Sequence, residues 1–211
     1  MNEPTGSKID RPDEEWKKEL PPETFTVMRK HGTERAGTSP LNKEHRPGRY
    51  ACASCGLTFK KEYPKLLRPG AKTPVVLDIH DFLSSRIAGI KLNPVNKSIT
   101  VHDPCHLGRG QGLSRTVRDL LKPIPGLSLV EMKDSDRCCG FGGVMRITHR
   151  SLSDGIAVDK INNIIATRAA VVATGCPGCC MQIADALRRH ESDIGVVHPV
   201  QLLEEALTGL K

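Results

Sequence analysis

Aromatic residues and long apolar runs are scarce in this chain of 211 residues. Aromatics make up 3% of the sequence and apolar residues 38%, so a core must be built mainly from Val, Ile, Leu and Ala. No apolar run approaches the roughly twenty residues that span a bilayer. The first thirty residues are charged and contain no apolar core of a signal peptide. These absences predict a chain without a transmembrane segment and a cytoplasmic location.

Positive charge is concentrated in one part of the sequence. Residues 1–48 carry nine basic and nine acidic side chains, whereas residues 49–100 carry nine against three. The excess lies in the segment that contains Lys60, Lys61, Lys65, Arg68 and Lys72. Such a segment is either a solvated face or a docking face for an acidic partner. We favour the solvated face, and the lack of interleaved aromatics argues against a nucleic-acid partner.

Short apolar runs alternate with helical patterns from about residue 75 onward. The predicted strands are 98–102, 127–132, 169–174 and 194–198, with a strand or buried turn at 75–79. The predicted helices are 81–90, 113–122, 151–167, 181–189 and 200–207, and Ser151 and Ser153 are candidate caps of the third. This alternation predicts an α/β fold with a mainly parallel sheet and flanking helices. Residues 1–48 are polar and rich in Pro and Gly, which predicts a largely irregular extension with one amphipathic stretch at 14–29.

Five of the eight cysteines follow three of the predicted strands. They are Cys105, the adjacent pair Cys138 and Cys139, and the pair Cys176 and Cys179. Because the carboxyl ends of parallel strands meet at one edge of a sheet, we expect these five thiols to converge there. Helix N-termini at this edge favour anionic thiolates. Thiolates bind iron–sulfur clusters and soft metals, so the pattern predicts a metal centre.

Zinc, inert burial and a disulfide are the alternatives for these cysteines. A zinc site built from the pairs Cys52–Cys55 and Cys176–Cys179 would satisfy four-coordination. It would leave Cys105 and the Cys138–Cys139 pair without a role. A buried unreactive role, or a disulfide between Cys138 and Cys139, is disfavoured by Gly140, Gly142 and Gly143 directly after the pair, because such a loop lets the backbone approach a ligand closely. Cys180 fits none of these schemes.

Two other patterns have alternative interpretations. The stretch from Gly108 to Gly112 is similar to a dinucleotide-binding loop, but its third glycine comes one position early. We therefore interpret it as a tight connection between a strand and a helix. His102, His106 and His198 all fall at predicted strand ends. Each could supply a proton near a cluster, but we favour hydrogen-bonded structural histidines.

Four stretches resemble one known family. They are His102 to His106, Cys138 to Gly143, Ala173 to Cys179, and His198 to Val200. They resemble the cysteine-rich (CCG) domain that is found in one subunit of heterodisulfide reductase and in the iron–sulfur subunits of glycolate and lactate oxidases. The resemblance covers residues 59–211.

The resemblance implies a redox subunit rather than a self-sufficient enzyme. Its cofactor would be a 4Fe–4S cluster of the noncubane type, held by Cys105, Cys138, Cys139, Cys176 and Cys179. The expected partners are a flavin-containing dehydrogenase subunit or other redox subunits, with peripheral attachment to a membrane through a partner. Whether the cluster only transfers electrons or also acts on a substrate disulfide stays open.

The upstream segment resembles another family. Residues 12–58, including the stretches 16–20 and 48–52, are similar to the start of methionine-(R)-sulfoxide reductases. In that family a Cys-x-x-Cys pair here is half of a structural zinc site, which implies a second metal site at Cys52 and Cys55. The catalytic-cysteine segment has no counterpart, so we expect no sulfoxide reduction. The expected domains are thus 1–58 and 59–211, and the alternative function is a zinc-binding module.

Overall fold

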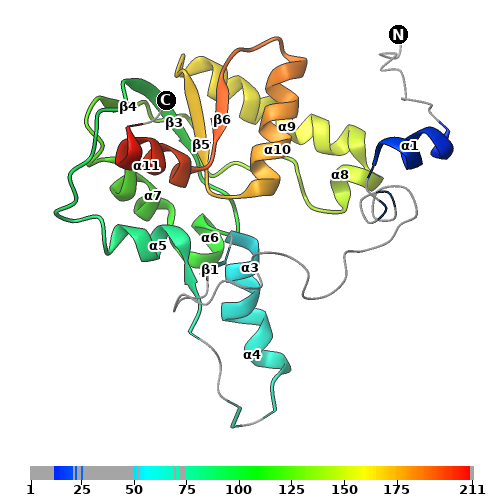
Figure 1. The fold of residues 1–211 in the computed structure, drawn as a ribbon, viewed down its shortest axis with the longest axis horizontal. Coiled ribbons are helices and arrows are strands. Elements are labelled where there is room, and N and C mark those ends of the chain that lie inside the picture. Colours follow the sequence, from blue (N-terminus) through cyan, green and yellow to red (C-terminus); the bar gives the residue numbers. More distant parts are fainter. Residues whose placement is uncertain are drawn as a thin grey trace. The chain divides into compact units, whose positions relative to one another are not determined.

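The computed structural model describes residues 12–20, 22, 25, 50–51, 53–68, 70–71 and 75–209. The chain divides into two units, residues 1–48 and 49–211. In the first unit, helix α1 (Asp13–Glu19) has acidic side chains in its first turn and basic ones in its last (Figure 1), which complements the helix dipole. This helix falls on the amphipathic stretch expected at 14–29, most of whose remaining residues lie outside the described part.

The second unit is built on a parallel sheet of four strands. Their spatial order is β4 (Leu127–Leu129), β3 (Lys97–His102), β5 (Val171–Thr174) and β6 (Gly195–Val197). Ile99 of the central strand β3 lies opposite Leu129 on one side and Val171 on the other. The structure therefore confirms the expected α/β fold with a parallel sheet and flanking helices.

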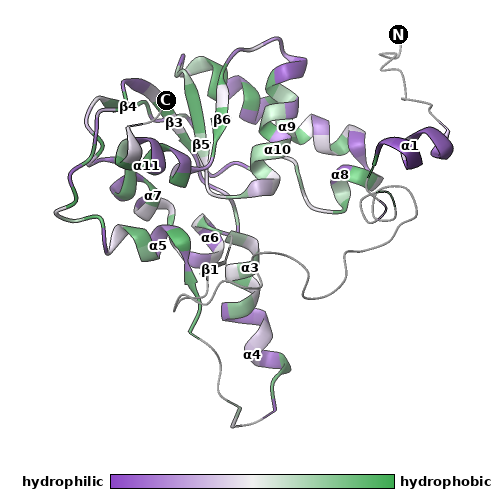
Figure 2. Cartoon of the chain, in the orientation of Figure 1, coloured by the Kyte–Doolittle hydropathy of each residue, from purple (hydrophilic) through white to green (hydrophobic). Residues whose placement is uncertain are grey.

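Helices pack on both faces of this sheet (Figure 1). One face packs against α7 (Ser114–Leu121) and α11 (Pro199–Thr208), and the other against α9 (Arg150–Ala166) and α10 (Pro177–Arg189). Successive strand residues point to opposite faces, so Ala173 joins the first layer and its neighbour Val172 the second. Figure 2 shows hydrophobic residues along the central strands and a hydrophilic α1.

Branched aliphatic side chains supply the core, as the scarcity of aromatics requires. In the second layer Ile161 and Ile164 of α9 and Ile183 and Leu187 of α10 are almost fully buried. They recur at three- and four-residue spacing, which places them on one face of each helix. Burial of one such side chain stabilises the fold by roughly 1.5–3 kcal/mol. This layer therefore holds α10 against the sheet.

Shorter elements surround the sheet. They are β1 (Tyr50–Ala51), α3 (Ala53–Leu57), the π-helix η2 (Thr58–Glu62), α4 (Tyr63–Leu66), β2 (Leu77–Asp78), α5 (Ile79–Ser84), α6 (Gly108–Gln111) and α8 (Met145–Thr148). Strands β1 and β2 pair in parallel. The stretch from Gly108 to Gly112 forms α6 and closes on Gly112 at a φ of 76°, which is the expected tight connection. None of the described helices is both long and apolar enough to cross a bilayer.

Several helix boundaries differ from the sequence-based expectation. Helix α5 spans Ile79–Ser84 rather than the expected 81–90, and two helix starts also differ. Helix α10 begins at Pro177 rather than at residue 181, because Cys176 is extended and Pro177 occupies the first helical position, where proline is favoured. Helix α9 begins at Arg150 without a side-chain cap. Ser153 therefore does not cap it; its hydroxyl instead donates to the Gly140 carbonyl at 2.6 Å.

Candidate metal centre

The five cysteines lie in three loops at the carboxyl edge of the sheet. Cys105 follows β3, the pair Cys138 and Cys139 follows β4, and Cys176 follows β5 directly, with Cys179 in the first turn of α10. Strands β3 and β5 are neighbours, yet the helices that follow them pack on opposite faces. A crevice at such a topological switch point is the usual ligand site of open α/β sheets.

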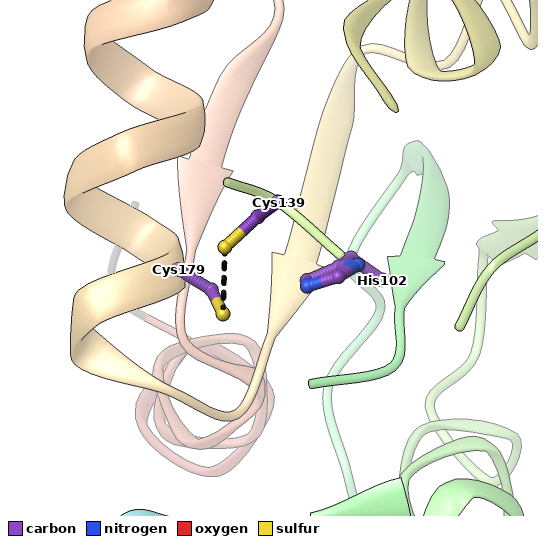
Figure 3. A group of neighbouring side chains, drawn as sticks. All are labelled: His102, Cys139 and Cys179. Atoms are coloured by element: carbon purple, nitrogen blue, oxygen red, sulfur yellow. Dashed lines mark hydrogen bonds between the residues drawn. The ribbon is translucent and has the colours of Figure 1, made fainter. Parts of the chain in front are cut away.

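The thiols form a continuous group across these loops. The sulfur atoms of Cys139 and Cys179 lie 3.2 Å apart, although forty positions separate them in sequence (Figure 3). Cys176 and Cys179 share a hydrogen bond, as do Cys138 and Cys139. Cys105 is close enough to Cys138 to influence its charge electrostatically. The structure thus places the five residues that the sequence singles out in three loops at one edge of the sheet.

Burial divides the centre into an inner and an outer part. Cys139 and Cys179 are buried, Cys176 is half-buried, and Cys105 and Cys138 are exposed. The exposed side also carries Arg109, which donates to Asp136 at 2.8 Å. That hydrogen bond raises the pKa of Arg109, with smaller contributions from Cys105 and Cys138. The outer rim therefore combines two accessible thiols with a permanent positive charge.

Hydrogen bonds from neighbouring groups stabilise thiolates in the centre. A bond from Cys179, together with the backbone N–H groups of Cys179 and Gly178, lowers the pKa of Cys176 to about 5. Bonds from Cys138 and Cys179 lower the pKa of Cys139, while the same contacts raise the pKa of Cys138 and of Cys179. A helix N-terminus favours thiolates in the same way. Soft, preassembled sulfur donors are the chemistry that an iron–sulfur cluster requires, so these residues fit such a group.

Gly140 fixes the loop that carries Cys138 and Cys139. Its φ is +85°, and a Cβ built on it would lie 2.3 Å from the Ser153 carbonyl oxygen of α9. The Gly140 N–H also faces the Cys138 sulfur at 3.3 Å. This glycine is therefore needed for close approach to a helix and not only, as the sequence suggested, for approach to a ligand.

A buried ion pair joins the Cys105 turn to the Cys138 loop. Arg118 donates to both carboxylate oxygens of Asp103, at 2.9 and 3.0 Å, and to Glu131. Asp103 in turn accepts from the Ser135 hydroxyl at 2.7 Å, and its own N–H donates to the Ser135 carbonyl at 2.9 Å. Because Asp103 is 4% exposed, this network positions two of the three cysteine loops relative to each other.

Lys160 lies fully buried behind the same loop. Its ammonium group donates to the carbonyls of Asp134 at 2.6 Å and Ser135 at 3.1 Å. Burial lowers the pKa of Lys160 to about 8, against the opposing effect of nearby anionic groups that include Cys139. A cation inside a protein needs such partners. The sequence did not predict a role for Lys160, because the residues around it in its helix are those expected around an exposed lysine.

The three histidines at strand ends have different surroundings. His198 caps α11, since its Nδ1 accepts from the Val200 N–H at 3.3 Å. His106 is exposed and bonds the Ser54 hydroxyl at 2.8 Å. Both fit the structural role that the sequence favoured. His102 is hydrogen-bonded to the Ser135 carbonyl through Nδ1. Its Nε2 has no hydrogen bond of normal geometry in the described part of the chain, although the ring helps to lower the pKa of the neighbouring Cys139.

The remaining three cysteines differ from this group in their surroundings. The Cys180 thiol donates to the Thr174 carbonyl at 3.5 Å, and burial raises its pKa to about 11. A protonated thiol bonded to a carbonyl is not a metal donor, in agreement with its expected lack of a role. Cys55 lies exposed on α3. Cys52, its expected partner in a second metal site, lies outside the described residues.

Comparison with known families identifies the segment that carries these loops. Residues 99–184 match the family described as the cysteine-rich domain, CCG. This segment is similar to that cysteine-rich domain. It contains all five cysteines of the centre together with His102 and Lys160. Residues 20–65 match the SelR domain, in agreement with the expected likeness of the upstream segment to sulfoxide reductases.

Several known proteins are similar to this chain over two thirds or more of its length. One subunit of the fumarate reductase (CoM/CoB) of Methanothermobacter marburgensis is 41% identical over 156 residues, which are 74% of this chain and 31% of the relative. One subunit of the dihydromethanophenazine:CoB–CoM heterodisulfide reductase of Methanosarcina barkeri is 36% identical over 165 residues, 75% of this chain and 40% of the relative. Lactate utilization protein A of Oceanobacillus iheyensis is 30% identical over 152 residues, which are 68% of this chain and 62% of the relative.

These likenesses confirm the expected relation to heterodisulfide reductase subunits and to lactate-utilizing proteins. Further relatives are described as iron–sulfur proteins, which supports an iron–sulfur cluster as the group that the cysteine-rich domain holds. The chain spans about a third of the length of the first of these relatives and about two fifths of the second.

Proposed function

We propose that this chain binds one iron–sulfur cluster through Cys105, Cys138, Cys139, Cys176 and Cys179 and serves in electron transfer within a larger oxidoreductase. The observation that carries the proposal is the convergence of thiols from three loops, with the Cys139 and Cys179 sulfurs 3.2 Å apart. A disulfide scaffold does not need five such thiols, and a closed zinc site needs only four donors.

The number of thiols also bears on the type of cluster. Ordinary 4Fe–4S clusters use four cysteine ligands. The contiguous group here has a fifth, because Cys138 and Cys139 are adjacent and both approach the other thiols. We therefore propose a 4Fe–4S cluster of the noncubane type, in which five thiolates are used.

The surroundings suit a centre that exchanges electrons with another protein. The bound cluster would supply one-electron transfer. On the outer rim, exposed Cys105 and Cys138 beside Arg109 leave the centre accessible to a docking surface, while Cys139 and Cys179 keep its inner side away from water. A flavin-containing dehydrogenase subunit or a disulfide-reducing subunit is the proposed partner. The proposed location is cytoplasmic, with any membrane attachment provided by that partner.

A zinc-binding module is the second candidate, and one observation favours it. The SelR match includes Cys52 and Cys55, a spacing typical of half a structural zinc site. The proposed domains are residues 1–58, with that half-site, and residues 59–211, with the five cysteines of the metal centre. Ser54 of the same helix bonds His106 beside the cysteine-rich centre, so a second metal here would lie next to the first site.

Metal analysis after anaerobic purification distinguishes the two candidates. Iron, acid-labile sulfide and zinc are quantified on one sample, and EPR spectra are recorded in oxidised and reduced states. The cluster proposal predicts about four iron and four sulfide per chain and an EPR signal in one redox state. Near-stoichiometric zinc without acid-labile sulfide would contradict it and would support the zinc-binding module.

A further inference from the structure

His102 lies at the edge of the metal centre, on its buried side. It is the last residue of β3, and strand alternation places it on the face opposite to Ile99 and Val101, which pack towards α7 and α11. That is the face on which Cys139 and Cys179 are buried with α9 and α10. The side chain is 2% exposed, and its ring points at the two sulfurs (Figure 3).

The protonation of the ring follows from its hydrogen bond. Nδ1 lies 3.1 Å from the Ser135 carbonyl oxygen. A carbonyl oxygen can only accept, so Nδ1 must carry the proton and Nε2 of the neutral ring must present a lone pair. The same carbonyl also accepts from the Asp103 N–H and the Lys160 ammonium. These bonds fix the position of the Ser135 carbonyl, and its bond to Nδ1 then fixes the orientation of the His102 ring.

The Nε2 lone pair has no hydrogen-bond partner among the described residues, although the atom is buried. A ring nitrogen of His102 and the sulfurs of Cys139 and Cys179 all lie within 4.8 Å of one another. In metal sites a histidine ligand almost always donates its other ring N–H to a carbonyl or carboxylate. His102 has that arrangement: one nitrogen is committed to a backbone carbonyl and the other is open towards two thiols.

We propose that His102 is a nitrogen ligand of the centre, binding iron through Nε2 beside Cys139 and Cys179. This inference rests on the proposed cluster and adds a sixth donor to its five thiolates. The neutral ring gives a lone pair to the metal, so no proton is released and no electron is transferred. A neutral nitrogen brings no negative charge, so His102 as a sixth donor would leave the net charge of the cluster unchanged.

Donation of a proton from Nε2 to a sulfur is the competing role. It would need a proton on Nε2 in addition to the one on Nδ1, which would give the ring a positive charge beside that of Lys160. The Lys160 ammonium already shares the Ser135 carbonyl with the ring, so two cations would bond one oxygen. Electrostatic repulsion between them disfavours this arrangement, whereas the ligand role leaves the ring neutral.

Pulsed EPR of the cluster-loaded full chain tests the proposal directly. The protein is labelled with ¹⁵N-histidine, and iron and sulfide are measured on the same sample. We expect one strongly coupled histidine nitrogen in wild type. It should vanish in His102→Gln and persist in His106→Gln, the matched control beside Cys105. A stoichiometric cluster without a strongly coupled nitrogen would overturn the ligand role and leave the proposed function standing.

A measurement with cobalt keeps the inference testable if no cluster forms. Co²⁺ alone is added to the anaerobic, reduced full chain, and proton NMR is recorded. Binding through Nε2 predicts a shifted, exchangeable signal from Nδ1–H, absent in His102→Gln and present in His106→Gln. That result without cluster formation would contradict the proposed function but support the histidine ligand. Thiolate-to-cobalt absorption without the shifted signal would overturn the ligand role.

Discussion

The Asp103 carboxylate accepts two hydrogen bonds from the Arg118 guanidinium, at 2.9 and 3.0 Å, on the turn that carries Cys105. Asp103 is 4% exposed and Arg118 is mostly buried. An ion pair in such a place is costly to break, because removal of one partner leaves the other charge buried and unpaired. The first prediction follows from this pair.

Replacement of Arg118 by alanine should lower the free energy of unfolding by about 3 kcal/mol, the lower end for a buried pair. It should also decrease iron retention, because Asp103 connects the Cys105 turn to Ser135. The matched control is Arg115→Ala on the same helix. Its pair with Asp119 is 3.8 Å long and largely exposed, so the cost should stay below about 0.5 kcal/mol. Equal losses in urea unfolding would contradict the role of the Asp103 pair.

The conformation of Gly140 gives a second prediction. In Gly140→Ala the new methyl group would meet the Ser153 carbonyl at 2.3 Å, so the Cys138–Cys139 loop must move away from α9. We expect a large loss of bound iron after anaerobic purification. Gly143→Ala is the control, because Gly143 also has a positive φ of 58° but open space around its Cβ position. The Gly143→Ala variant should lose only roughly 1–2 kcal/mol of unfolding free energy, because alanine disfavours the left-handed backbone conformation. It should retain its iron.

Much of the fold could be predicted from the sequence. The periodicity of the apolar residues located β3, α7, α9, β5 and α11 within a few residues, and the rule that parallel strands end at one edge predicted the convergence of the five cysteines. The start of α10 was missed because Pro177 and Gly178 were interpreted as loop residues. In the structure, Cys176 is the extended residue before a helix whose first position is proline.

The groups around the cysteines could not be predicted in the same way. Lys160, Asp103 and Ser153 are polar residues whose roles depend on partners 13 to 32 positions away in sequence. Local propensity says nothing about such tertiary contacts. The only signal for His102 was its position at a strand end, which His106 and His198 share. The hydrogen bond to Ser135 is what separates it from the other two.

The charge of Lys160 should affect the redox properties of the centre. Burial lowers its pKa to about 8, so the ammonium is still mostly charged at pH 7 and stabilises extra negative charge on a cluster nearby. Lys160→Met should therefore lower the reduction potential measured by redox titration at pH 7. The wild-type potential should also fall as the pH rises through about 8, and that of the variant should not. Lys133 is an exposed lysine of the loop whose Asp134 carbonyl Lys160 contacts, and Lys133→Met should leave both unchanged.

The partly buried histidine that caps α11 predicts a dependence of stability on pH. Burial lowers the pKa of His198 to about 4, from an ordinary value of 6.5. Between these two values the unfolded chain binds a proton that the folded chain does not, so stability is lost as the pH falls from about 6.5 to about 4. His198→Asn keeps a capping side chain without a titrating group. Its thermal midpoint should therefore decline less over this range, and parallel curves would contradict the prediction.

Iron retention in two single-cysteine variants tests the account most directly. Cys139 lies at the centre of the thiol group, whereas Cys180 donates to the Thr174 carbonyl. After identical anaerobic purification, iron and acid-labile sulfide are measured in Cys139→Ser, Cys180→Ser and wild type. The account predicts that Cys139→Ser loses most of its iron and sulfide, while Cys180→Ser matches wild type. Equal contents in the two variants would contradict a cluster held by Cys105, Cys138, Cys139, Cys176 and Cys179.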